Sequence, residues 1–319
     1  MASTSAASSS STDPLLDRLG RRVVGRRREL ELVVAALAAG RHILLEGPPG
    51  TGKSTLLRAV ADELRIGFEF VEGNAELTPA RLVGHFDPAR VMTDGYAPDV
   101  FVDGPLVSAL HDGSLLYVEE INRIPEETLN VLITVMSEAE LHVPRLGRVL
   151  ASPGFRLVAA MNPFDAVGTA RISSAVYDRT CRLLVDYQSA EDEAAIVEQS
   201  VGPGASALDE TWMATMVELV RRTRSHPEVR IGSSVRGAID ATAVAASLAE
   251  VRGMPASSPS VGLDAALIAL SGRVRLRDGV TRTSEEIITE LWGEVFGRRT
   301  EGGGQGKAGA PTGATSSPS

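Results

Sequence analysis

Cysteine is almost absent from this chain, because Cys181 is the only one. A single cysteine excludes an internal disulfide framework and any metal or iron–sulfur site built from several cysteines. Long apolar runs are also missing, since the longest are short pieces such as residues 33–39, well below the about 18 residues of a membrane span. Residues 1–14 lack the basic and apolar regions of a signal peptide. We therefore expect a cytoplasmic protein without a membrane span, with Cys181 as a small core residue.

Positive charge is outnumbered, with 32 Lys and Arg against 41 Asp and Glu and a net charge of -9. Such a field repels phosphate backbones, so we expect no nucleic-acid partner. The basic segment 18–28 is interpreted as a solvated helix entry or a subunit contact. The five histidines show no metal-ligand spacing, which argues against a histidine metal site.

The 319 residues, 43% of them hydrophobic, are enough for a buried core and favour two domains. The first half alternates short β-branched runs with amphipathic helical patterns, which predicts parallel strands covered by helices. The fold class is α/β: a parallel-sheet core with helices on both faces, followed by a small all-helical domain. The expected strands lie at 42–47, 68–73, 114–120, 155–162 and 181–187.

Composition changes mark the expected domain boundaries. Residues 1–14 and 299–319 are rich in Ser, Gly, Pro and Thr and are predicted to be disordered. An α/β domain is expected over 15–200 and a helical domain over 201–298, the Gly-Pro-Gly of 202–204 lying at the boundary. Two stretches interrupt the first half, 85–103 and 139–153, and each is predicted to be a hairpin emerging from a βα connection.

A phosphate-binding loop is the strongest motif in the sequence. GPPGTGKS at 47–54 fits G-x-x-x-x-G-K-S/T and lies directly after the strand HILLE and before a helix. Its glycines let consecutive amide groups and the helix N-terminus face nucleotide phosphates. Lys53 is expected to reach the β and γ phosphates of ATP, and Ser54 to ligate Mg²⁺.

Polar side chains end two further strands. Glu119 and Glu120 follow the apolar run SLLYV, whose strand we expect beside the phosphate-loop strand, and Asn162 follows FRLVAAM. At this edge Glu119 would hold metal-bound water, Glu120 would act as general base, and Asn162 would place an amide near the attacking water. Taken alone, an acidic pair after a strand is also a solvated helix start, and Asn before Pro a turn former.

In combination, these pieces resemble the MoxR family of AAA+ ATPases, which is related to the ATPase subunit of magnesium chelatase. The resemblance covers about residues 20 to 297, although GPPGTGK alone fits many AAA+ proteins. The matching segments are VVGRRRE at 23–29, LLEGPPGTGKS at 44–54, FVDGPLVSALHDGSLLYVEEINR at 101–123, AAMNPFDAVGTARISSAVYDR at 159–179 and GSSVRGAIDATAVAASLA at 232–249.

The resemblance implies that residues 15–200 are an AAA+ nucleotide-binding domain with a P-loop core and that residues 201–298 are its all-helical lid. It also implies roles for single residues. It makes 119–120 the end of Walker B, Asn162 sensor 1, Arg179 an arginine finger inserted into the neighbouring subunit's site, and Arg236 sensor 2. The two interrupting stretches would be the helix-2 insert and the pre-sensor-1 hairpin, which move with the nucleotide state in related ATPases. The expected nucleotide-binding residues are Val24 and Gly25 near the adenine, then Gly47, Pro48, Pro49, Gly50, Thr51, Gly52, Lys53, Ser54 and Thr55 of Walker A.

It also implies an oligomer, by family habit a hexameric ring, that remodels a client or a metalloenzyme complex with a separate partner carrying a von Willebrand factor A domain. Two departures stand out: Glu119 replaces the usual Asp, which predicts slower hydrolysis, and Thr180 replaces a Phe after the finger. Without the family, Arg179 is also readable as a surface ion-pair residue and Arg236 as a helix cation.

Three other functions stay open on the residues alone: an ATP-gated binding module with little turnover, a DNA-acting AAA+ motor, and a small-molecule P-loop kinase. The kinase is weakened because the acidic pair and both arginines suit water activation better.

Overall fold

A computed structural model describes residues 14–163, 173–202 and 208–302. The chain forms two compact units, Met1–Ser189 and Ala190–Ser319. Helix α9 (Ala190–Val201) packs against α10 (Glu210–Ser225) and α11 (Val235–Arg252), so the division between the units falls before α9. The boundary expected from the sequence lies at the end of this helix. Disorder was expected for residues 1–14 and 299–319. In the structure Pro14 is the first residue of a helix, and the last helix runs to Gly302. Residues 1–13 and 303–319 lie outside the described residues.

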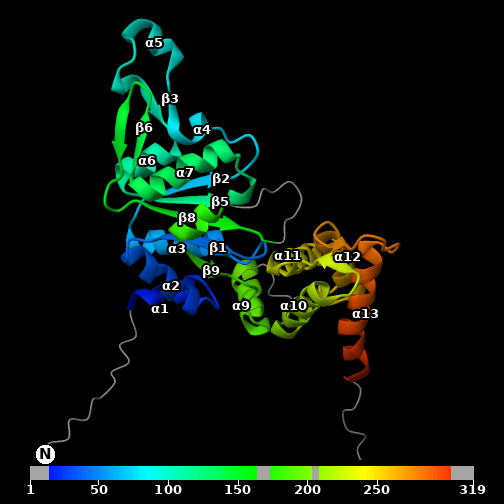
Figure 1. Cartoon of the computed structure of the whole chain (residues 1–319). Coiled ribbons are helices and arrows are strands. Elements are labelled where there is room, and N and C mark those ends of the chain that lie inside the picture. Colours follow the sequence, from blue (N-terminus) through cyan, green and yellow to red (C-terminus); the bar gives the residue numbers. More distant parts are fainter. Residues whose placement is uncertain (1–13, 164–172, 203–207, 303–319) are drawn as a thin grey trace, which may run out of the picture. The chain divides into compact units, whose positions relative to one another are not determined.

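The first unit is built on a five-stranded sheet of order β2-β5-β8-β1-β9 (Figure 1). All of its strand pairs are parallel, as predicted. One expectation is wrong: the strand carrying the acidic pair, β5, does not adjoin the phosphate-loop strand β1, because β8 lies between them. The strands are β1 (His42–Glu46), β2 (Phe68–Glu72), β5 (Leu115–Glu119), β8 (Arg156–Met161) and β9 (Thr180–Leu184).

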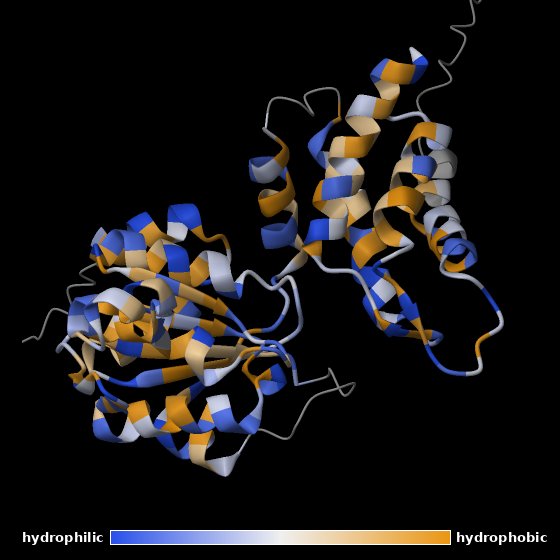
Figure 2. Ribbon diagram, turned by 90° about the horizontal axis from the view of Figure 1, so that it is seen from above, coloured by the Kyte–Doolittle hydropathy of each residue, from blue (hydrophilic) through white to orange (hydrophobic). Residues whose placement is uncertain are grey.

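Helices cover both faces of this sheet. Successive strand residues point to opposite sides, so Leu45 packs with one helical layer while Leu44 packs with the other. Figure 2 shows the strands as predominantly hydrophobic, which is the pattern of a parallel sheet buried on both faces. One layer contains α1 (Pro14–Arg22), α2 (Arg27–Ala38) and α3 (Lys53–Leu64); the other contains α4 (Pro79–Val83), α6 (Pro105–Asp112), α7 (Glu126–Glu138) and α8 (Ser174–Arg179).

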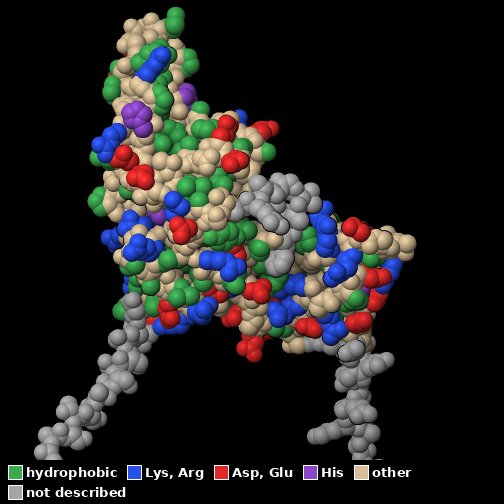
Figure 3. Space-filling view, viewed as in Figure 1, with side chains coloured by type: hydrophobic (Ala, Val, Ile, Leu, Met, Phe, Trp, Pro, Cys, Tyr) green, Lys and Arg blue, Asp and Glu red, His purple; other side chains and the backbone are tan. Residues whose placement is uncertain are grey.

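The two interrupting stretches form hairpins, as expected. Strands β3 (Gly84–Phe86) and β4 (Phe101–Asp103) pair antiparallel and enclose α5 (Pro88–Asp94) and the turn η1 (Pro98–Val100). Strands β6 (Glu140–Val143) and β7 (Gly147–Leu150) form the second hairpin. Figure 1 shows α5 projecting away from the sheet, and Figure 3 shows hydrophobic side chains on the surface of that projection.

The two hairpins touch each other. The guanidinium of Arg145, at the tip of the second, lies 3.7 Å from the ring centre of Tyr96 in the first. That ring also packs edge-on against Phe86 at 5.1 Å. A cation over an aromatic face is attracted by the ring quadrupole, so the contact couples the two hairpins.

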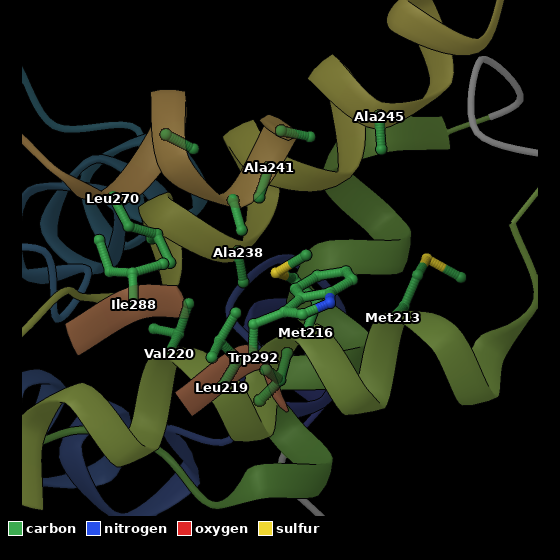
Figure 4. Close-up of a cluster of buried hydrophobic side chains, with 14 of the residues drawn as sticks. Met213, Met216, Leu219, Val220, Ala238, Ala241, Ala245, Leu270, Ile288 and Trp292 are labelled. Carbon is green, nitrogen blue, oxygen red and sulfur yellow. The ribbon is translucent and has the colours of Figure 1, made fainter. Parts of the chain in front are cut away.

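The second unit packs its helices around a separate core, part of which is drawn in Figure 4. Trp292, Met216 and Leu219 lie together there, facing the small residues Ala238 and Ala241 of α11. The expectation of an all-helical lid needs correction, because a short antiparallel pair, β10 (Val229–Ile231) with β11 (Arg275–Leu276), joins the helices. The helices are α9, α10 (Glu210–Ser225), α11 (Val235–Arg252), α12 (Pro259–Leu270) and α13 (Ser284–Gly302).

Cys181 is exposed rather than a core residue. It lies on β9, an edge strand of the sheet, whose other side has no neighbouring strand among the described residues. The apolar run suggested burial on both faces, but an edge strand leaves part of its surface uncovered.

Candidate functional site

The predicted phosphate loop joins β1 to α3, as the sequence required. Gly47 comes so close to the neighbouring chain that a Cβ there would lie 1.9 Å from the carbonyl oxygen of Val185, so no larger residue fits. Gly52 takes a left-handed conformation with φ of 81° and caps α3 without any side-chain hydrogen bond. The first N–H groups of α3 therefore remain for a ligand, and an anion is the ligand that a helix N-terminus favours.

Lys53 is folded into this loop. It is 7% exposed, and its Nζ donates to the carbonyl oxygens of Gly47 at 3.0 Å and Pro48 at 2.8 Å. An ammonium in such a position neutralises charge inside the loop and needs only to exchange carbonyl partners for phosphate oxygens. That Lys53 binds the β and γ phosphates stays a prediction.

Ser54 and Glu119 meet as the metal-site prediction requires. The Ser54 hydroxyl donates to Oε1 of Glu119 at 3.2 Å, which shows that the longer acidic side chain reaches the serine. A hydroxyl and a carboxylate are oxygen donors of the kind Mg²⁺ prefers, and Mg²⁺ usually takes its other ligands from phosphates and water. Among the described residues no three His, Cys, Asp or Glu side chains gather into a metal cage. The pair therefore fits Mg²⁺ carried by a nucleotide.

Tyr117 is a third member of this group that the sequence analysis did not single out. It is fully buried, and its hydroxyl lies 3.2 Å from the hydroxyl of Ser54. Burial raises the pKa of Tyr117 above its usual value, and the negative charge of Glu119 raises it further, so the phenol stays protonated. The tyrosine can therefore donate a hydrogen bond at neutral pH.

Glu120 stands at a strained point in the chain. Its backbone is left-handed, with φ of 53° and ψ of 43°, at the start of the turn η2 (Ile121–Arg123). Its Oε2 lies 3.0 Å from Nη1 of Arg123. The N–H of Gly73, at the end of β2, donates to the carbonyl of Glu119 at 2.7 Å and fixes the backbone just before the strained residue. Left-handed non-glycine residues of this kind concentrate at functional sites.

Asn162 follows the end of β8, the strand between β1 and β5. The carbonyl of the preceding residue, Met161, accepts a hydrogen bond from the N–H of Gly47 at 3.1 Å. The sheet order thus places Asn162 at the edge between the phosphate loop and the acidic pair. Within the segment 159–179 that resembles the family, residues 164–172 lie outside the described residues.

Arg179 lies at the other end of the sheet. It closes α8, and the next residue, Thr180, pairs with His42 at the beginning of β1, whereas the phosphate loop follows the end of β1. From His42 to Glu46 the five-residue strand advances by four rises, about 13 Å. Its Nη1 donates to the carbonyl of Ala175 at 3.0 Å, and its Nε donates to the Ser137 hydroxyl. Arg179 therefore does not join the other predicted residues within its own unit.

The remaining predicted residues lie on separate elements. Val24 is half-buried and Gly25 exposed, between α1 and α2. Arg236 is an exposed residue in the first turn of α11, in the second unit. Just before that helix, the carbonyl of Ser233 accepts a hydrogen bond from Nε of Arg224 at 2.7 Å.

Arg26 is a site residue that the sequence analysis misjudged. The basic segment around it was interpreted as a solvated helix entry or a subunit contact, yet Arg26 is 4% exposed. Its Nη2 donates to the carbonyl of Thr51 in the phosphate loop at 3.0 Å and to the carbonyl of Asp186, and its Nη1 pairs with Glu29 at 2.8 Å. The sequence offered one sign of this role: Arg26 directly follows Val24 and Gly25, and an acidic residue, Glu29, lies three positions later.

Comparison with known proteins identifies a related domain in the first unit. Residues 42–180 match the family model of the AAA domain (dynein-related subfamily). The chain has the AAA+ P-loop fold with a helical lid. Together the matched domain and the fold support the prediction of an AAA+ ATPase.

Relatives and solved structures extend the likeness. YeaC of Bacillus subtilis, itself uncharacterized, is 29% identical over 248 residues, covering 70% of this chain and 74% of YeaC. An uncharacterized protein of Staphylococcus epidermidis is 34% identical over 155 residues, and the chain spans only 58% of its length. A provisionally assigned ATPase of Cytophaga hutchinsonii superposes with a TM-score of 0.50 at 20% identity, covering 87% of this chain and 92% of that one.

The Thermotoga maritima RuvB Holliday junction branch migration motor superposes with a TM-score of 0.52 at 17% identity, covering 76% of this chain and 67% of RuvB. At such identities the likeness is one of fold. Among the helices of the described residues, none has the length and apolarity needed to cross a bilayer.

Proposed function

We propose that this protein is a magnesium-dependent ATPase that assembles into a ring, of six subunits by AAA+ habit, and uses hydrolysis to remodel a partner protein or metalloenzyme complex in the manner of the MoxR family. The observation that carries the ATPase part is the group formed by Lys53 inside the phosphate loop and Ser54 hydrogen-bonded to Glu119. The phosphate loop, the metal-binding pair and the adjoining Glu120 supply the kinds of groups that ATP hydrolysis requires.

In this proposal each residue has a separate task. Lys53 binds the β and γ phosphates, and Ser54 with Glu119 holds Mg²⁺, which when bound neutralises phosphate charge. Glu120 takes the proton of the attacking water, after turning from Arg123 toward the phosphate. Asn162, at the neighbouring strand end, orients that water. Since the Glu120–Arg123 pair is partly exposed, breaking it costs little.

The position of Arg179 supports an oligomer. An arginine about 13 Å of strand away from its own phosphate loop is badly placed to neutralise charge there. In a head-to-tail ring the finger of one subunit meets the loop of the next, so hydrolysis depends on assembly. Arg236 acts in this proposal as the second arginine, supplied by the helical unit when ATP is bound.

The client remains a matter of family likeness, and we propose a separate protein with a von Willebrand factor A domain. A nucleotide-gated binding module with little turnover is the second candidate, favoured by Glu119 in place of Asp. The Ser54–Glu119 hydrogen bond argues for turnover, because the longer acid does reach its partner. A DNA-acting motor is less well supported, because the likeness to RuvB is one of fold and the net charge is -9.

Magnesium-dependent ATP hydrolysis against protein concentration tests the proposal, on wild type beside Glu119→Asp and Lys53→Ala. Activity that rises more than linearly with concentration and disappears in Lys53→Ala supports a shared-site ATPase. Tight ATP binding without turnover, restored by Glu119→Asp, supports the binding module instead. Unchanged ATP affinity in Lys53→Ala contradicts the phosphate cradle itself.

A further inference from the structure

Tyr117 holds its hydroxyl in a fixed place beside the metal-binding pair. The side chain is fully buried, and its ring packs against Phe68 and Phe70 with centroid distances of 6.0 and 5.7 Å. Burial beside these two rings of β2 leaves the tyrosine ring little freedom, so packing helps to fix the position of its hydroxyl.

A phenylalanine would fill the same space without a buried polar atom. The other buried residues of β5, namely Leu115, Leu116 and Val118, are apolar. A buried hydroxyl costs free energy unless it is hydrogen-bonded. At Tyr117 the hydroxyl lies 3.2 Å from that of Ser54 and also interacts with Glu119, so its presence is tied to the pair that the proposed function assigns to Mg²⁺.

The hydrogen-bonding capacity of Ser54 explains what the tyrosine contributes. A serine hydroxyl has one proton to donate and two lone pairs with which to accept. Its proton goes to Oε1 of Glu119, which leaves a lone pair free to accept from the Tyr117 hydroxyl 3.2 Å away. One lone pair is then left, and it has a defined direction. Without the tyrosine, the serine hydroxyl would be held by Glu119 alone.

We propose that Tyr117 is a positioning residue for the magnesium site: its hydroxyl orients Ser54 so that the serine, although paired with the longer Glu119, presents a lone pair to Mg²⁺. This inference rests on the proposed function, because it takes Ser54 and Glu119 as the metal-binding pair. It adds a residue on the strand interior, two positions before the acid, which acts through the serine and does not touch the nucleotide.

The test is a Tyr117→Phe variant of the full chain, titrated with a fluorescent ATP analogue in EDTA and at increasing MgCl₂. The expected result is unchanged affinity in EDTA and an increase of about fivefold in the Mg²⁺ concentration at half-saturation, the size of one lost hydrogen bond. Tyr96→Phe is the matched control, since it removes a phenol hydroxyl from the projecting hairpin and should leave the Mg²⁺ requirement at the wild-type value.

A double-mutant cycle separates positioning from other effects. In a Ser54→Ala background, adding Tyr117→Phe should change the Mg²⁺ requirement no further, because the tyrosine acts through the serine. An equal increase in both backgrounds overturns the proposal, as does an unchanged Mg²⁺ requirement in Tyr117→Phe alone. A variant that fails to fold also overturns it, by showing that the hydroxyl serves stability. If wild type binds no ATP in EDTA or Mg²⁺, the proposed function itself fails.

Discussion

Nη2 of Arg26 lies 3.0 Å from the carbonyl oxygen of Thr51, and the same nitrogen donates to the carbonyl of Asp186. One buried guanidinium thus ties the phosphate loop to the segment that follows the edge strand β9. That segment leads within a few residues to Ala190, where the second unit begins. Arg26 therefore links the phosphate loop to the end of the first unit.

Replacing Arg26 by Gln should loosen the cradle. The change leaves two carbonyl oxygens and Glu29 without their partner in a buried place, so we expect the first unit to lose about 2–3 kcal/mol of stability. ATP affinity should fall by about tenfold, since a mobile loop must be ordered again on binding. Circular dichroism with denaturant and nucleotide titration measure the two effects.

Arg27→Gln is the control, because Arg27 is the next residue and its ion pairs with Asp17 and Glu31 are exposed. Exposed pairs of this kind contribute at most about 1 kcal/mol. If the two substitutions have equal effects on ATP affinity, the tether has no part in nucleotide binding.

Glu120→Gln should separate binding from hydrolysis. The amide keeps the size of the side chain but cannot accept the proton of the attacking water, so turnover should fall by about a hundredfold or more while ATP affinity stays near the wild-type value. Since ATP then persists in the site, the assembled state should accumulate, which sedimentation in the presence of MgATP would detect. Glu126→Gln, on the exposed first turn of α7, is the matched control. Hydrolysis by Glu120→Gln at the wild-type rate would remove its role as general base.

Local patterns in the sequence were enough to predict most of the elements of this fold. Each predicted strand carries its own apolar run, and the phosphate loop marks the end of β1 by its glycines. The order of the strands was harder, because no local signal shows that β8 lies between β1 and β5. Pairing in a parallel sheet is set by long-range packing, and the same reason explains why the two short strands β10 and β11 were not predicted.

The site shows the same division between local and long-range information. The positions of Lys53 and of the Ser54–Glu119 pair follow from motif spacing along two strands. Arg26 and Tyr117 did not, because their importance depends on which atoms of distant segments surround them. An arginine in a basic run and a tyrosine in an apolar run each have an ordinary interpretation until the fold supplies their partners. The catalytic roles themselves remain predictions that the variants test.

Mixing two inactive variants tests whether Arg179 acts on a neighbouring subunit. Arg179→Ala lacks the finger and Glu120→Gln lacks the base, so each alone should be nearly inactive. In a mixed ring, an Arg179→Ala subunit keeps its own base and receives the finger of a Glu120→Gln neighbour, so about one quarter of the sites are complete at equal amounts. Activity should therefore reappear in the mixture. Absence of rescue at every ratio, with mixed assembly confirmed by native mass spectrometry, contradicts a shared site.

His42 should make the stability of the first unit depend on pH. Burial, together with the positive charge of Arg156, lowers its pKa from 6.5 to about 4, and its Nδ1 accepts the N–H of Leu157 at 2.9 Å, which requires this nitrogen to be unprotonated. The folded pKa lies below the unfolded one, so this stability is complete above about pH 6.5 and is lost as pH falls toward 4. Between pH 7.5 and pH 5 the loss should be about 2 kcal/mol.

His42→Asn keeps an acceptor for Leu157 but does not titrate, so the variant should lack that part of the pH dependence. His142→Asn, an exposed histidine of β6, serves as the control. Because Trp212 and Trp292, the only tryptophans, both belong to the second unit, their fluorescence would follow the wrong part of the molecule. Hydrogen exchange of the amides of β1 and β8 reports on the first unit directly. If the exchange protection of wild type and His42→Asn falls equally between pH 7.5 and pH 5, after correction for intrinsic rates, the buried histidine does not control this transition.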